Sequence, residues 1–570
     1  MSSLDWIVLS GTVALIVGYG TWKSRAVRDV ETYLRGGRDI RWYAVGLSIM
    51  ATQASAITFL SVPGQAYEDG LGFVQFYFGL PIAMVLLAAI VTPIYFRLKV
   101  YTAYEYLERR FDRKTRQLTA LLFLIARGLA AGLSIYAPSI ILSTVFGWPL
   151  QATNLAIGLL VILYTVSGGT RAVNQTQTYQ MIVILGGMAA AFGFLLHRLP
   201  PQVSFGDALG IAGVLGKMKA VDLSPHLGTR YTLWTGLTGG LFVQLAYFGT
   251  DQSQVQRYLS GSTLSESRLG LLMNGLVKIP MQLGVLLVGV LVFVFYQFHQ
   301  PPVFFNQAEL ERVRATPAAP ELRALESAFA GAWGDKKRDL EALVAARHDG
   351  DSVELVRARE RLRAAEARTQ AIRRDTKDVI GRAAPRAELK DADYIFIRFV
   401  TDQFPAGLLG LLVAVIFCAA MSASAAALNA LSTTTVIDLY KRSIKPQASD
   451  RHYLRAAQLF TVFWGLLAVS FAASAALLDN LIQAVNILGS IFYGPMLGVF
   501  LVGFFIKWVR GTPVFVATLI AQTIVIGTFL YSSIGFLWYN VIGCAALVGL
   551  ALALEAIARL LARAPEPHPR

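Results

Sequence analysis

Polar side chains are few in the long apolar stretches of this sequence, and they gather at a small number of places. One stretch carries a run of small and hydroxyl-bearing residues, from Gly46 to Thr58, at its middle. Such a run tolerates an unwound turn, whose freed carbonyl groups can coordinate a cation. The alternative is a tightly packed face of a regular helix. Polar groups are costly inside a bilayer, so these places are the first candidates for function.

Two further stretches offer ligands for an ion and for a solute. Ala419, Ser422 and Ala423 share one helix face because they are spaced i, i+3, i+4. A hydroxyl with helix carbonyls suits a hard cation, although a serine can also bond to its own helix. Gln244 and Tyr247 lie three residues apart and also share a face. They offer hydrogen bonds and an aromatic lid to a solute, or a hydrogen bond between helices.

Two charged residues also fall within or near apolar stretches. Arg127 lies about ten residues into its stretch, roughly 15 Å along a helix. It requires a partner: a carboxylate on a neighbouring helix, a carbonyl cluster or an anionic substrate, with a structural partner favoured. Asp251 lies near the end of its stretch, where it either caps a helix or pairs with Arg257.

The motifs of covalent, metal and ATP-driven chemistry are missing from the sequence. It has no Walker lysine motif, no G-x-S-x-G elbow and no Cys-x-x-Cys pair, and its six histidines lack metal-ligand spacing. We therefore predict that the protein is not an enzyme and has no cofactor, and that an ion gradient drives any uphill transport. Cys418 and Cys544 lie in apolar stretches and are predicted to be reduced packing residues.

The elements that position these residues are predicted to be membrane-spanning helices. The chain has 570 residues, of which 55% are hydrophobic and 15% charged, whereas about 25% are charged in soluble domains. A helix needs about 20 apolar residues to cross a bilayer. Thirteen stretches qualify, which predicts an all-α integral membrane protein: 4–22, 42–64, 72–97, 117–145, 150–168, 175–197, 233–256, 268–298, 405–438, 454–477, 482–506, 512–531 and 537–560.

Positive charge predicts the orientation of these helices in the cell membrane. Lys and Arg gather in segments 23–41, 97–116 and 441–455, which fall on one side if thirteen helices alternate. The opposite loops 65–71, 146–149, 478–481 and 532–536 contain no Lys or Arg. The N-terminus is therefore predicted outside and the C-terminus in the cytoplasm. This distribution explains much of the net charge of +15 without a nucleic-acid partner.

One polar region interrupts the pattern. Residues 306–392 are rich in Ala, Arg, Glu and Leu and show a helical spacing of apolar residues with a turn at Asp349-Gly350-Asp351. We predict a helical hairpin outside the membrane, inserted between helices 1–8 (1–305) and helices 9–13 (393–570). It is expected to be a solvated insertion without chemistry; a partner-binding or gating role is the alternative.

Several spaced motifs resemble the sodium:solute symporter family. They are Tyr101–Phe111 (YTAYEYLERRF), Gly168–Val173 (GGTRAV), Gln256–Leu259 (QRYL) and Thr433–Tyr440 (TTTVIDLY). The resemblance covers the second to eleventh spans and implies a LeuT-type fold. In that fold two inverted five-helix repeats each begin with a helix broken at the midplane, and solute binds between the repeats.

The resemblance also implies a sodium site and two departures from it. The family's carbonyl ligands match Ala51, Ala54 and Ala419, and its hydroxyl ligands match Ser422 and position 423. Position 423 is Ala here. Gln177 stands where the family usually has Asp beside the ion's exit path. We expect sodium as the coupling ion; a weakened sodium site, proton coupling or uncoupled transport are the alternatives.

For the solute, the resemblance implies a polar and aromatic site. Positions used by the family's sugar-binding members match Thr58, Gln244, Tyr247 and Phe248, with Tyr247 as the inner gate. The run Ile135–Pro138 resembles the monocarboxylate and vitamin branch, and with Arg127 it makes an organic anion plausible. We therefore expect an importer of a small organic solute, a sugar or an organic anion such as a monocarboxylate, with the lipid bilayer and no obligate protein as further partners. A solute sensor of the same fold is the alternative.

Overall fold

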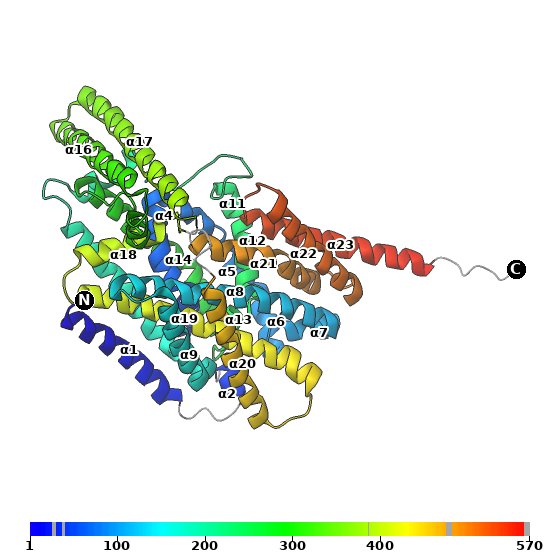
Figure 1. Cartoon of the computed structure of the whole chain (residues 1–570). Helices are drawn as coiled ribbons and strands as arrows, with labels where there is room; N and C mark the ends of the chain where they lie inside the picture. Colours follow the sequence, from blue (N-terminus) through cyan, green and yellow to red (C-terminus); the bar gives the residue numbers. More distant parts are fainter. Residues whose placement is uncertain (25–29, 37–39, 386, 475–480, 564–570) are drawn as a thin grey trace.

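The computed structural model describes residues 1–24, 30–36, 40–385, 387–474 and 481–563. Within them the chain is helical, and the only β-pairing recorded is an isolated bridge between Ile40 and Gly261. The long helices form one bundle, with α1 beside α9 and α19 and with α22 and α23 at the opposite edge (Figure 1). Basic segment 23–41 and loop 478–481, which contributed to the predicted orientation, lie partly outside the described residues.

The helices of the bundle follow the predicted spans. They are α1 (Ser3–Ser24), α3 (Trp42–Gln53), α4 (Ala56–Asp69), α8 (Arg113–Phe146), α9 (Leu150–His197), α11 (Leu233–Leu237), α12 (Gly239–Thr250), α13 (Gln252–Leu259), α14 (Leu264–Phe298), α19 (Leu408–Thr434), α20 (Asp450–Ala472), α21 (Leu481–Phe505), α22 (Gly511–Tyr531) and α23 (Leu537–Arg563). The span predicted at 72–97 is a series of short helices: η1 (Gly70–Tyr77), α5 (Leu80–Leu86), η2 (Leu87–Val91) and α6 (Thr92–Leu98). The π-helix η3 (Thr435–Ile444) continues α19.

In the described part of the chain, nine helical segments are long and apolar enough to cross a membrane. Three other predicted spans are α1, the first part of α9 and the series α11–α13, which are shorter or interrupted. The span predicted at 42–64 is divided between α3 and α4, and α4 begins the long segment Ala56–Leu98. The two spans predicted at 150–168 and 175–197 follow one another in α9, which kinks at Gly169 with φ 55°. A side chain there would meet the Tyr33 carbonyl oxygen at 2.7 Å, so glycine is required.

Two of the interruptions lie in the second and seventh predicted spans, which the family resemblance implies are broken, and the small and hydroxyl residues of the second span also allowed for its break. Between α3 and α4, Ala54 has φ −83° and ψ 79°, and Ser55 is extended with ψ 173°. Between α12 and α13, Asp251 is extended with ψ 117°. At each break, backbone groups lose their helical partners. Both breaks are buried, because Ala54 and Asp251 are both 0% exposed.

Close helix crossings hold the broken helix α4 in place. A Cβ atom on Gly64 would lie 1.9 Å from the carbonyl oxygen of Ala392, the first residue of α18 (Ala392–Gln403). A Cβ atom on Gly289 of α14 would lie 2.2 Å from the carbonyl oxygen of Pro63. Glycine therefore allows the backbones to touch on both sides of α4, which is typical of packed membrane helices.

The polar region forms a hairpin that projects from the bundle (Figure 1). It comprises α16 (Ala319–Asp349) and α17 (Ser352–Ala383), joined at Gly350 with φ 70°, and is preceded by α15 (Gln307–Arg314). Its tip contacts α10 (Phe205–Val214), where Arg347 Nε lies 3.1 Å from Asp207 Oδ1. At its base, Arg373 and Lys377 bind Asp391 at 2.9 and 3.0 Å.

Burial and charge compete at this base. Burial alone would raise the pKa of Asp391. Arg373, Lys377 and the backbone N–H of Phe305 lower it by more, so the pKa lies below the ordinary value. The carboxylate is therefore ionised and anchors the hairpin next to α18.

Two short helices, α2 (Val30–Arg35) and α7 (Tyr104–Arg110), complete the fold on the other side of the bundle. Cys418 and Cys544 are buried and free, as predicted.

Candidate functional site

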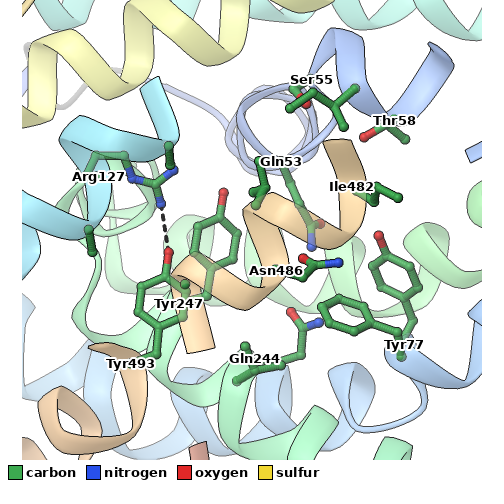
Figure 2. A pocket seen from close by; sticks show the side chains of 17 residues that line it. Gln53, Ser55, Thr58, Tyr77, Arg127, Gln244, Tyr247, Ile482, Asn486 and Tyr493 are labelled. Atoms are coloured by element: carbon green, nitrogen blue, oxygen red, sulfur yellow. Dashed lines mark hydrogen bonds between the residues drawn. The ribbon is translucent and has the colours of Figure 1, made fainter. Parts of the chain in front are cut away.

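A small cavity lies where the α3–α4 break faces α8, α12 and α21 (Figure 2). Its volume is about 90 Å³. Its walls combine apolar side chains with polar and aromatic ones. The side chains with polar groups are Gln53, Ser55, Thr58, Tyr77, Arg127, Gln244, Tyr247, Asn486 and Tyr493.

Four of the five residues predicted to contact solute line this cavity. Thr58 lies on α4, Arg127 on α8, and Gln244 and Tyr247 on α12. Phe248 does not line it: its side chain is 0% exposed and packs beside Tyr247, with ring centroids 4.9 Å apart.

Arg127 pairs with Asp251, the residue at the break between α12 and α13. Its Nε lies 3.1 Å from Asp251 Oδ2, and its Nη2 also donates to that oxygen. Tyr493 joins the pair: its hydroxyl accepts from Nη2 at 3.1 Å and donates to Asp251 Oδ2 at 3.0 Å. The guanidinium carbon lies 5.3 Å from the ring centroid of Tyr247, so an aromatic face also contacts the charge.

This arrangement decides between the alternatives for Asp251. Its Oδ1 caps α13, accepting from the backbone N–H of Ser253 at 2.9 Å and from its hydroxyl at 2.6 Å. The predicted alternative, a pair with Arg257, is wrong: Arg257 donates to Asn174 and to Gln256 instead. The break turns α13 so that Arg257 enters a separate buried polar cluster.

Several polar atoms at the cavity have no hydrogen-bond partner among the described residues. They are Gln53 Oε1, Gln244 Oε1 and Asn486 Nδ2. Buried polar atoms are normally satisfied, so these three are free to bind a solute. Sequence reasoning missed Asn486, Tyr493, Gln53 and Tyr77. Asn486 and Tyr493 carried a signal, because each is a polar group inside an apolar span.

Two of the four residues predicted to bind a cation are in direct contact, and all four lie on α3, α19 or the break after α3. Ser422 Oγ on α19 donates to the Ala51 carbonyl oxygen on α3 at 3.0 Å. Ala54 lies at the break that follows α3, and Ala419 lies one turn before Ser422. All four are buried. The available donors are carbonyl and hydroxyl oxygens, which fit a hard cation such as sodium.

The two altered positions border the same place. Gln177 on α9 donates to Thr52 Oγ1 at 2.9 Å and to the Ser422 carbonyl oxygen at 3.3 Å, and its Oε1 accepts from Ser48. An uncharged amide thus links α3, α9 and α19. Ala423 presents only a methyl group beside Ser422. No group of three His, Cys, Asp or Glu side chains that could hold a metal was found in the described ranges.

Comparisons with known proteins agree with this architecture. The model of the sodium:solute symporter family matches residues 33–321 and 376–521. The chain is 32% identical over 362 residues to the human sodium/iodide cotransporter, a match that covers 60% of this chain and 54% of that protein. It is 26% identical over 509 residues to the human sodium-coupled monocarboxylate transporter 1, covering 88% of this chain and 69% of that one.

A solved structure supports the fold. The substrate-bound outward-open state of a Na⁺-coupled sialic acid symporter aligns with a TM-score of 0.76 over 98% of both chains, at 22% identity. The all-α membrane fold of LeuT type is thereby confirmed, and the protein is a multi-pass membrane protein. With the family model matching most of the chain, this protein belongs to the sodium:solute symporter family of secondary transporters.

Proposed function

We propose that the protein imports a small anion, such as a monocarboxylate or a halide, together with sodium. The observation that supports this most strongly is the cationic side chain in the cavity wall. Arg127 is 12% exposed, and its Nε and Nη2 face Asp251 and Tyr493. Arg127 also lines the cavity, so its guanidinium can reach an anion that enters there.

The rest of the cavity suits a compact solute of this kind. Its volume of about 90 Å³ favours a solute of few atoms. The free oxygens of Gln53 and Gln244 and the free amide nitrogen of Asn486 would orient the solute's polar groups. Two relatives are named for iodide and for monocarboxylates, which are small anions.

Sodium is proposed to bind at the junction of α3 and α19. Its ligands would be the carbonyl oxygens of Ala51, Ala54 and Ala419 and the hydroxyl of Ser422. The α3–α4 break then serves both sites: Ala51 and Ala54 face the ion, while Ser55 and Thr58 line the solute cavity. Occupancy of either site stabilises the same break, and a shared element of this kind is what couples two ligands.

A neutral polar solute such as a sugar is the second candidate, because uncharged amide and hydroxyl groups also line the cavity beside Arg127. Proton-coupled or uncoupled transport and a sensor of the same fold are the other candidates for how the site is used. For orientation, we retain the proposal that the N-terminus lies outside the cell membrane and the C-terminus in the cytoplasm.

Thermal unfolding of the purified protein in detergent tests the proposal. We expect iodide and propionate to raise the unfolding temperature in sodium but not in choline buffer at equal ionic strength, since a ligand of the folded state stabilises by RT ln(1 + [L]/Kd). Propionamide, the neutral counterpart, should have little effect. Arg127→Gln should abolish the anion response, whereas Arg382→Gln, which removes an exposed hairpin charge, should retain it. A response to glucose instead, or an intact anion response in Arg127→Gln, would contradict the proposal.

A further inference from the structure

Asp251 occupies the inner side of the guanidinium that faces the cavity. Its side chain is 1% exposed, and it does not line the cavity, whereas Arg127 and Tyr493 do. The carboxylate therefore approaches Arg127 from behind, and a solute would approach from the front. One guanidinium is thus placed between a resident carboxylate and the solute space.

The resident carboxylate divides its two oxygens between two tasks. Oδ1 caps α13 through Ser253, and Oδ2 accepts from Arg127 and Tyr493. A buried guanidinium without a counter-ion would destabilise the fold, so the carboxylate offsets the cost of burying Arg127 when no anion is bound. It also cancels the charge that attracts an anion. The two effects have opposite consequences for solute binding.

We propose that Asp251 is a specificity-determining residue: it competes for Arg127 and so sets the affinity for the anionic solute. This inference rests on the proposed function, because it requires an anion at Arg127. An anion that binds Arg127 from the cavity meets a guanidinium that is already neutralised, and it is repelled by the carboxylate behind it. Its affinity is therefore lower than it would be at a guanidinium without a carboxylate partner.

Asp251→Asn separates the charge from the shape of this residue. Asparagine is as good a helix N-cap as aspartate, so the cap on α13 can be kept while the negative charge is lost. We expect the Kd for propionate, measured in sodium by isothermal titration, to fall at least tenfold. The Kd for propionamide should change less than twofold, because a neutral solute does not sense the charge. Asp251→Ser, which also provides a capping hydroxyl, serves as a second variant if Asp251→Asn does not fold.

A second background tests whether the effect passes through the guanidinium. Arg127→Gln should not bind propionate, and adding Asp251→Asn in that background should not restore binding. The inference is overturned if the folded Asp251 variant binds propionate no more tightly than the wild type, or if propionamide tightens equally. These outcomes can be distinguished from failure of the proposed function. If the proposed function is wrong, neither iodide nor propionate would bind the wild type, and Arg127→Gln would change nothing.

Discussion

Replacing Ala423 with Ser should strengthen sodium binding. The proposed site offers four protein oxygens, the carbonyls of Ala51, Ala54 and Ala419 and the hydroxyl of Ser422, while a cation in a dry site needs about five or six. Ala423 follows Ser422 directly on α19 and is 7% exposed, so a serine hydroxyl there would be added beside the existing ligands.

The expected gain in sodium affinity follows from the charge of the bound ion. A hydrogen bond or comparable contact to a charged group contributes about 1.5–3 kcal/mol. We take the lower end, because the added hydroxyl also loses its bond to the helix carbonyl or to water. About 1.4 kcal/mol corresponds to a tenfold change in affinity, so the half-saturating sodium concentration should fall about tenfold.

The assay is a sodium titration of the unfolding temperature, with choline replacing sodium at constant ionic strength. Ala427→Ser is the matched control, because it lies one turn, about 5.4 Å, further along α19 and is 3% exposed. Ser422→Ala should abolish the sodium response. The reasoning is refuted if Ala423→Ser and Ala427→Ser shift the titration equally, or if Ser422→Ala leaves it unchanged.

Two further substitutions test the surroundings of the site and the base of the α16–α17 hairpin. Gln177→Ala should destabilise the protein by about 1–3 kcal/mol, because it removes the buried hydrogen bonds to Thr52 and Ser422, and this should appear as a lower unfolding temperature in choline. The increase in unfolding temperature on adding sodium should persist. Loss of that increase would mean that the amide itself is needed for ion binding. Burial raises the pKa of Glu388, outside the membrane, to about 8 from 4.5. The contribution of this carboxyl group to the stability of the folded protein is therefore full below pH 4.5 and is lost as the pH rises through 8. Glu388→Gln, which stays neutral and can still accept from the Tyr394 hydroxyl, should therefore show a flatter unfolding temperature between pH 5 and 8.5, and an unchanged pH dependence would contradict this account.

The local chemistry of the chain explains why the helix breaks were predictable. The run of small and hydroxyl residues from Gly46 to Thr58 contains the Ala54–Ser55 break, because such residues impose little helix packing and allow extended backbone. The same holds for the thirteen apolar spans, which depend only on length and hydropathy. Neither feature requires knowledge of which helices are neighbours.

The charge pair could not be predicted, because it depends on packing between distant helices. Arg127 and Asp251 are 124 residues apart and meet only because α8 lies against the α12–α13 break. Arg257 was a nearer candidate in the sequence, but the break directs it to Asn174.

Uptake into liposomes containing the purified protein tests the central claim most directly. With an inward sodium gradient, wild-type protein should accumulate labelled iodide or propionate above the outside concentration, and dissipating the gradient with a sodium ionophore should release it. Arg127→Gln should show no accumulation under the same conditions. Accumulation that is equal with and without the sodium gradient, or equal in Arg127→Gln and wild type, would contradict sodium-coupled transport of an anion through this cavity.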